Sequence, residues 1–159
     1  MPGNLTSEQV WREVEKHSFA VLGFVTPRAE ARTAGIVYLV REHELYITTW
    51  RNSWKARYIG SNPHVSLTVT IPKRILLAPW VHIPDATITF AGEALLHAID
   101  AVPEDIPRTL LRGLELSAEQ KKEISIIRVR PAGEFLTYGV GVPLRIMRHP
   151  EAASGRAPV

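Results

Sequence analysis

The sequence predicts a mainly β protein, a β-barrel with a few short helices. Six or more short segments are rich in β-branched and aromatic residues and are separated by turn residues, which is typical of an all-β barrel. Helical patterns are few and short. The chain has 159 residues, 45% of them hydrophobic, which suits one domain with a proper core.

The N-terminal part of the chain predicts a helix and then a buried strand. Thr6 and Gln9 have the spacing of a capping box, and the helix is expected to run to about Lys16. Residues 18–26 are almost wholly apolar, so we expect a strand that is buried on both faces or inside a barrel. Residues 27–30 form the turn that follows.

The centre of the chain predicts a hairpin and a short helix. Residues 36–41 alternate with period two, Glu42-His43-Glu44 interrupts the pattern, and residues 45–49 are again β-branched and aromatic. Ser53 is a good N-cap for a helix over about residues 54–60, which Asn62-Pro63 ends.

Hydroxyl and basic side chains gather where the second strand of this hairpin meets the helix. They belong to Thr48, Thr49, Arg51, Ser53, Lys55 and Arg57. Because a helix N-terminus presents free N–H groups and a partial positive charge, this combination can hold a phosphate. The alternative from the residues alone is a solvated basic helix beside a strand.

The rest of the chain continues the barrel and adds one excursion. Residues 72–84 are rich in proline, and either rim a pocket or partner surface or pack as an extended edge on the barrel. We predict a single domain over residues 1–147 and a C-terminal tail over 148–159. Residues 139–159 are rich in Gly, Pro and Arg, and we expect them to lie over the surface or a neighbouring chain. The remaining elements expected are strands at 64–71, 85–97, 123–130 and 133–140 and a helix at 108–116.

Composition and spacing exclude several kinds of site. The chain has no cysteine, which excludes disulfides, thiolate metal sites and cysteine nucleophiles. The six histidines lack metal-site spacing, and there is no glycine-rich phosphate loop and no G-x-S-x-G motif. We therefore predict no catalytic side chain and no metal ligand, which suits a cofactor that carries its own chemistry.

Partners and location follow from similar observations. No apolar run reaches the roughly 20 residues of a membrane span, and a net charge of +3 is mild. We expect a cytoplasmic protein that acts on a small molecule, with no membrane or nucleic-acid partner.

Several segments follow one another in a recognisable order: FAVLGFVTPRAEARTAGIVYLV, then ELYITT, then SWKARYIGSNPHVSLTV. This order resembles the pyridoxamine 5′-phosphate oxidase-like FMN/deazaflavin-binding split β-barrel family over roughly residues 5–71. The resemblance implies a split barrel of Greek-key type. It also implies a homodimer with two equivalent cofactor sites at the dimer interface.

The resemblance further implies which residues hold the cofactor. The phosphate is expected at Thr48, Thr49, Ser53 and Lys55, with Arg57 nearby, and the edge of the isoalloxazine ring along Gly35, Ile36, Val37 and Tyr38. From the residues alone, Gly35 either lets a flat ring approach the backbone or marks a bulge or barrel corner.

The implied cofactor is FMN, with the deazaflavin coenzyme F-420 as the alternative. The deazaflavin form carries an acidic tail, which Arg51, Arg57, Lys73 and Arg74 can serve if they are not plain surface charge. Two departures limit the resemblance: the turn at 27–30 lacks Asp-Gly, and the C-terminal part lacks a pyridoxamine-phosphate signature. We therefore do not expect a vitamin-B6 oxidase.

Three functions are compatible with these observations. The first is a flavin- or deazaflavin-dependent oxidoreductase that acts by hydride transfer on a small organic substrate. The second is a non-catalytic flavin- or deazaflavin-binding or carrier protein, because no acid or base is evident. The third, nucleic-acid binding through Trp50, Trp54 and Trp80 among basic residues, is not adopted because barrel aromatics more often belong to a core.

Overall fold

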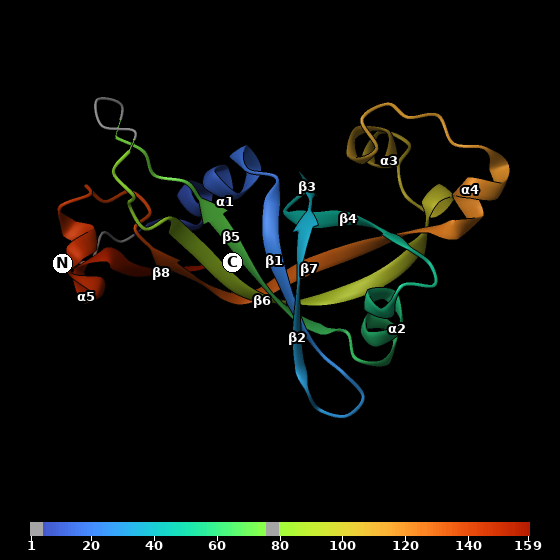
Figure 1. Ribbon diagram of the computed structural model, residues 1–159, viewed down its shortest axis with the longest axis horizontal. Coiled ribbons are helices and arrows are strands. Elements are labelled where there is room, and N and C mark those ends of the chain that lie inside the picture. The colour runs from blue at the N-terminus through green and yellow to red at the C-terminus, as the bar shows by residue number, and fades with distance from the viewer. Residues whose placement is uncertain (1–4, 76–79) are drawn as a thin grey trace.

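The computed structural model describes residues 5–75 and 80–159, and these form one antiparallel sheet of eight strands with short helices around it (Figure 1). The strand order is β2-β1-β5-β6-β7-β4-β3, and β8 pairs with β7. The mainly β prediction is therefore confirmed. The strands are β1 (Phe19–Val25), β2 (Ala31–Val37), β3 (Leu39–Arg41), β4 (Glu44–Trp50), β5 (His64–Ile71), β6 (Ala86–Ala98), β7 (Ile124–Tyr138) and β8 (Ser154–Pro158). The helices are α1 (Ser7–Lys16), α2 (Trp54–Ser61), α3 (Asp105–Leu110), α4 (Ala118–Glu123) and α5 (Pro150–Ala153), with 3-10 turns η1 (Ile99–Ala101) and η2 (Ile146–Arg148).

The sheet curls because a single residue joins its two edge strands. β2 ends at Val37 and β3 begins at Leu39, yet these strands lie at opposite ends of the strand order. The Cα atoms of Val37 and Leu39 are two residues apart and can be at most about 7 Å from each other. The two edges of the sheet must therefore come together at this point. β2 accordingly also contacts β4. The result is a curled sheet with a closed-off interior.

The main core fills the inside of this curl. Residues of each strand alternate between the interior and the exterior, and in β5 the interior positions are Val65, Leu67 and Val69. Helix α1 adds Val10 and Val14, both fully buried, to the same core. The expected capping box at Thr6 and Gln9 is present at the start of this helix.

A second, smaller apolar cluster lies on the outer face of the sheet. Tyr46 of β4 and Ile124 and Ile126 of β7 pack there against Ile99 and Ile106, which belong to the long connection between β6 and β7. This cluster holds the connection, with η1, α3 and α4, against the sheet.

The strand expected over residues 36–41 is divided in two at Tyr38. The backbone N–H of Tyr38 donates to Ser18 O at 2.8 Å, and its hydroxyl donates to Val14 O at 2.7 Å. Tyr38 therefore bonds to the segment before β1 and to α1, while its neighbours pair with opposite edges of the sheet. A local period-two pattern cannot reveal this break, because the partners lie far away in the sequence.

Two further expectations differ from the structure in position. The strands expected at 123–130 and 133–140 are one strand, β7, because a register irregularity opposite Thr89 and Ala91, with Gly133 at a positive φ of 81°, absorbs the interruption. The helix expected at 108–116 is α3, which starts earlier and ends before Arg112 and Gly113, whose φ angles of 53° and 75° are left-handed.

Two segments complete the comparison with the sequence. The segment 148–159, expected as a tail, contains α5 and ends in β8, which pairs with β7 from Glu134 to Tyr138. In the excursion at 72–84, residues 76–79 lie outside the described residues, and the flanking residues 72–75 and 80–84 form neither strand nor helix.

Candidate functional site

The expected phosphate site begins at the junction of β4 and α2. Ser53 caps α2, and its Oγ accepts from the backbone N–H of Ala56 at 3.2 Å. The Oγ1 atom of Thr49 lies 2.9 Å from Ser53 Oγ, within hydrogen-bond distance. The first N–H groups of a helix have no intrahelical acceptor, and the cap leaves those of Trp54 and Lys55 available. The structure thus brings Thr49, Ser53 and the start of α2 together.

Thr48 does not join this group through its side chain. Thr48 pairs with Ile126, which belongs to the outer cluster, whereas Thr49 pairs with Ser125. Adjacent strand residues point to opposite faces of a sheet. The two threonines, predicted as one pair of donors, therefore serve opposite faces.

The basic residues around α2 have no acidic partner in the part of the chain that is described. Lys55 is half-buried, and Arg51 and Arg57 are exposed. The first turn of α2 carries no acidic residue, and none of the ion pairs found in residues 5–75 and 80–159 involves these three cations. Their positive charges add to that of the helix N-terminus.

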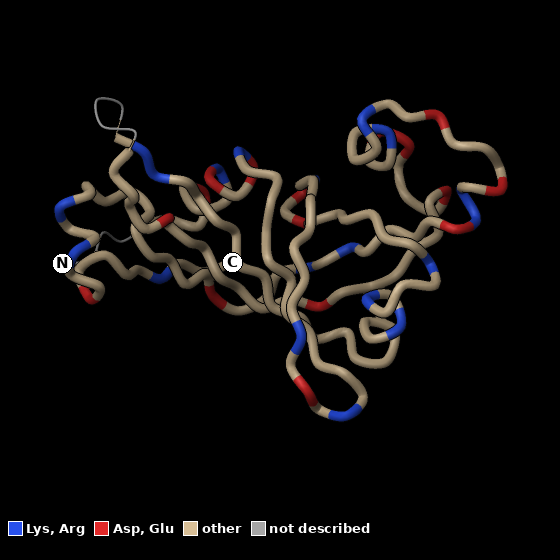
Figure 2. Tube along the Cα trace, in the orientation of Figure 1, with Lys and Arg blue, Asp and Glu red and all other residues tan. Residues whose placement is uncertain are grey.

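The basic residues of the 72–84 excursion lie elsewhere. Figure 1 shows the segment after β5 at the end of the molecule that carries α5, well away from α2. Figure 2 shows basic residues at both places. Lys73 and Arg74 therefore do not extend the positive surface at α2 within one chain.

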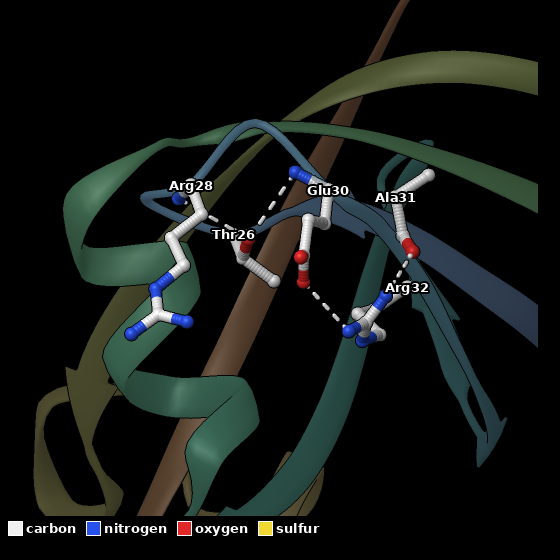
Figure 3. A network of polar contacts seen from close by, with 5 residues as sticks. All are labelled: Thr26, Arg28, Glu30, Ala31 and Arg32. Carbon is white, nitrogen blue, oxygen red and sulfur yellow. Dashed lines mark hydrogen bonds and ion pairs between the residues drawn. The ribbon is translucent and has the colours of Figure 1, made fainter.

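A fourth cation, which sequence reasoning missed, comes from the turn between β1 and β2. Thr26 Oγ1 accepts from the backbone N–H groups of Arg28 at 3.3 Å and Glu30 at 3.2 Å, and Glu30 pairs with Arg32 at 2.7 Å (Figure 3). Glu30 is thus engaged by Arg32, and the Arg28 side chain extends past α2 in this view.

Aromatic contacts hold this turn beside α2. The ring of Phe24 on β1 lies 5.2 Å from that of Trp54 and 6.0 Å from that of Tyr58. These contacts place the end of β1, and so the turn that carries Arg28, on the side of α2. The sequence offers no local signal for this packing.

The strand expected to lie along the cofactor ring presents half of its residues to the interior. Ile36 and Tyr38 are 4% and 3% exposed and belong to the main core. Burial raises the pKa of the Tyr38 hydroxyl. Gly35 and Val37 face outward, and a Cβ built on Gly35 would lie 3.2 Å from the ring of Phe19. In the structure, Gly35 is therefore covered by the ring of Phe19 from the same chain.

A polar network lies on the same outer face, over β4 and β7. The Glu44 carboxylate accepts from Arg130 Nε at 2.9 Å and from the Tyr46 hydroxyl at 3.2 Å, and Arg128 Nε lies 3.8 Å away. Burial and the charge of Glu44 raise the pKa of the Tyr46 hydroxyl. Sequence reasoning missed this network, although Arg128 and Arg130 stand two apart, as residues on one face of a strand do.

His97 lies beside this network, paired with Ile126. Its Nε2 atom is buried and finds no hydrogen-bond partner among the described residues. Burial, followed by the positive charge of Arg128, lowers the pKa of the imidazole. This shift favours the neutral form of the imidazole.

No family model matches the chain, and no curated protein matches its sequence. Solved structures do resemble it. A candidate pyridoxamine 5′-phosphate oxidase from Listeria innocua is similar over 78% of this chain and 91% of its own, with a TM-score of 0.61 and 18% identity. An F420 reductase is similar over 74% of this chain and 88% of its own, with a TM-score of 0.52 and 19% identity. The chain has the split-barrel fold.

The similarity to these solved structures confirms the split-barrel fold that was expected from the sequence. The fold alone does not determine the function, which depends on the residues placed on it. A heme-binding protein from Mycobacterium smegmatis is also similar, over 85% of this chain and 55% of its own, with a TM-score of 0.59 and 15% identity. Proteins of this fold thus carry names that point to different cofactors. The cofactor of this split barrel must be argued from its own side chains.

Neither Ser53 nor Lys55 lines the two clefts described next, which are formed by residues within 5–75 and 80–159. One, of about 690 Å³, lies in the connection between β6 and β7, and the other, of about 470 Å³, lies between α1 and β3. Within residues 5–75 and 80–159, no group of three or more His, Asp or Glu side chains is placed to hold a metal ion. Over the same residues, no helix is long and apolar enough to cross a membrane.

Proposed function

We propose that this split barrel is a flavin- or deazaflavin-dependent oxidoreductase, which binds the phosphate of its cofactor at the start of α2. One observation carries the proposal: within residues 5–75 and 80–159, Arg51, Lys55 and Arg57 lie in or beside the start of a capped helix and take part in no ion pair. FMN is the first choice of cofactor, and the deazaflavin coenzyme F-420 is the alternative. The reaction is hydride transfer to or from a small organic substrate.

The donor set at this site suits a phosphate. The hydroxyl proton that the Thr49–Ser53 hydrogen bond leaves free, the first N–H groups of α2 and the Lys55 ammonium are hydrogen-bond donors within residues 49–55. Charge-assisted hydrogen bonds to a phosphate are about twice as strong as neutral ones. Arg28, Arg51 and Arg57 add positive charge around these donors, which suits a second anionic group as well.

A bound flavin or deazaflavin supplies the redox chemistry itself. The chain's own residues bind and orient it. The cationic group at α2 anchors the phosphate end, and the outward side of β2 offers an apolar surface at Val37, beside the Phe19 ring that covers Gly35. No side chain is assigned an acid or base role in this proposal.

We further propose that two copies pair through the outer face of the sheet, which places the cofactor sites at the interface. Phe19 and Val37 are cross-strand neighbours on this face and are 48% and 53% exposed, and Leu136 and Leu95 are 46% and 44% exposed. Large exposed apolar patches mark interaction surfaces. A second copy over β1 and β2 also excludes water from the open side of the cofactor site.

The test is titration of FMN and of F-420 into the parent protein and the variant Lys55→Ala, followed by fluorescence. We expect Lys55→Ala to bind the preferred cofactor about ten- to a hundredfold more weakly, because one charge-assisted hydrogen bond is lost. The matched control is Lys122→Ala on α4, an exposed lysine away from the site, which should bind as the parent does. Equal affinity of Lys55→Ala and the parent would refute the phosphate site.

Steady-state turnover then separates the oxidoreductase from the alternative, a non-catalytic flavin- or deazaflavin-binding or carrier protein. Both functions require the binding that this titration measures. Only the first requires oxidation or reduction of a substrate at a rate that depends on the bound cofactor.

A further inference from the structure

The connection between β6 and β7 is far longer than the sheet requires. β6 ends at Ala98 and β7 begins at Ile124, yet the two strands are direct antiparallel neighbours. Such neighbours can be joined by two to five residues. The extra chain builds η1, α3 and α4, which project from one end of the sheet (Figure 1).

This connection lines the larger cleft with both apolar and charged residues, and we call the apolar ones its floor. The volume of about 690 Å³ lies within the range of small-molecule sites, roughly 300–1,000 Å³. Ile99 of the outer apolar cluster lines it, together with Val102, Leu111 and Leu116, which pack against that cluster. An apolar ring or short chain would cover this floor and remove it from water.

Five charged residues also line the cleft, and we call them its rim; all five are exposed and none pairs with another. The carboxylates of Asp100, Glu104 and Glu115 and the cations of Arg108 and Lys121 all line it. Among the described residues, none of these five side chains takes part in an ion pair or a side-chain hydrogen bond. Three carboxylates against two cations leave a net negative rim.

We propose that this cleft binds a small amphipathic amine, with its apolar body on the floor and its ammonium group among the rim carboxylates. The net charge of the rim selects the ammonium over a carboxylate, and the two rim cations also accommodate a zwitterion. This site is distinct from the cationic surface at α2, because Ser53 and Lys55 do not line the cleft.

Three molecules with one ring test the charge preference: tryptamine, tryptophan and indole-3-propionate. Each is titrated into the full-length protein without flavin, by calorimetry and by NMR of the backbone amides. We expect tryptamine to bind at least about tenfold more tightly than indole-3-propionate, which is the effect of one charge-assisted hydrogen bond. The shifted amides should belong to residues 99–121.

Near-isosteric variants locate the ammonium. Glu115→Gln and Asp100→Asn should each weaken tryptamine severalfold and leave indole-3-propionate unchanged or tighter. The control is Glu119→Gln, an exposed residue of α4 that does not line the cleft, and it should behave as the parent does. The variants change one charge each and no volume, so they are expected to fold.

Three results would overturn the proposal. They are amide shifts outside residues 99–121, an affinity for indole-3-propionate equal to or above that for tryptamine, and no binding at millimolar tryptamine. Because the experiment uses neither flavin nor turnover, its failure would leave the proposed oxidoreductase function untouched.

Discussion

Replacing Tyr38 with Phe tests how the curled sheet is closed. The hydroxyl donates to Val14 O at 2.7 Å, and the side chain is 3% exposed. Tyr38→Phe leaves that buried carbonyl without its donor. Loss of one partner of a buried hydrogen bond costs about 1–3 kcal/mol, so we expect the free energy of unfolding at neutral pH to fall by about 1–2 kcal/mol.

The same variant should change how stability depends on alkaline pH. Burial raises the pKa of the Tyr38 hydroxyl in the folded protein, while in the unfolded chain it titrates near pH 10. Above about pH 10 the unfolded state releases this proton and the folded state keeps it, so the parent loses up to about 1.4 kcal/mol of stability per pH unit. The variant lacks this loss. The variant, which is less stable than the parent at neutral pH, should therefore become as stable as the parent within about one to one and a half pH units above 10.

Urea unfolding followed by tryptophan fluorescence, at neutral pH and in steps above about pH 10, measures both effects. Tyr138→Phe is the control, because its hydroxyl also donates to a carbonyl, Met147 O at 2.8 Å, but the residue is only half-buried. It should lose less stability at neutral pH. If the difference in the free energy of unfolding between Tyr38→Phe and the parent stays constant above pH 10, this hydroxyl ionises as easily in the folded protein as in the unfolded chain.

Three further outcomes are expected. Gly92→Ala should lose about 1–3 kcal/mol of stability, because its Cβ would lie 2.9 Å from a backbone oxygen of β7. Gly60→Ala in α2, whose Cβ would meet nothing nearer than 3.8 Å, should gain about 0.5–1 kcal/mol. Equal melting temperatures of the two variants in thermal unfolding would contradict this packing. His43→Asn keeps a residue suited to the φ of 59° at this position but removes the imidazole ring that stacks 4.5 Å from the Trp11 ring. Denaturant unfolding should therefore show a loss of about 0.5–1.5 kcal/mol of stability. Unchanged stability would mean that the stacked rings do not stabilise the fold. Val37→Glu should shift the sedimentation coefficient from dimer to monomer at micromolar protein, and a parent that already sediments as a monomer with cofactor bound would exclude the proposed interface.

Elements with local signals were predictable from the sequence. The capping box at Thr6 fixes the start of α1, and the prediction of a strand over residues 64–71 matches β5 from His64 to Ile71. Both depend on neighbours a few residues apart. The N-cap at Ser53 is confirmed for the same reason.

Features that depend on distant partners were not predictable. The break at Tyr38 depends on Ser18 and Val14, which only the fold brings near. The turn that carries Arg28 follows a strand that lies beside α2 because Phe24 packs against Trp54. Thr48 and Thr49 differ from these cases, because the alternation along a strand, which places their side chains on opposite faces, is a local property of the sequence.

The one-residue link between β2 and β3 acts as a tether of fixed length across the seam of the sheet. Strand pairing alone would allow an open, twisted sheet, because each strand already has its hydrogen-bonded neighbours. The tether removes that freedom by holding the two outermost strands about 7 Å apart at one point. Curvature in this fold is therefore set by chain length at Tyr38 as much as by side-chain packing. Glycines inserted there would let the seam open while every ladder stays intact, whereas the same insertion in the turn between β1 and β2 would only lengthen a loop.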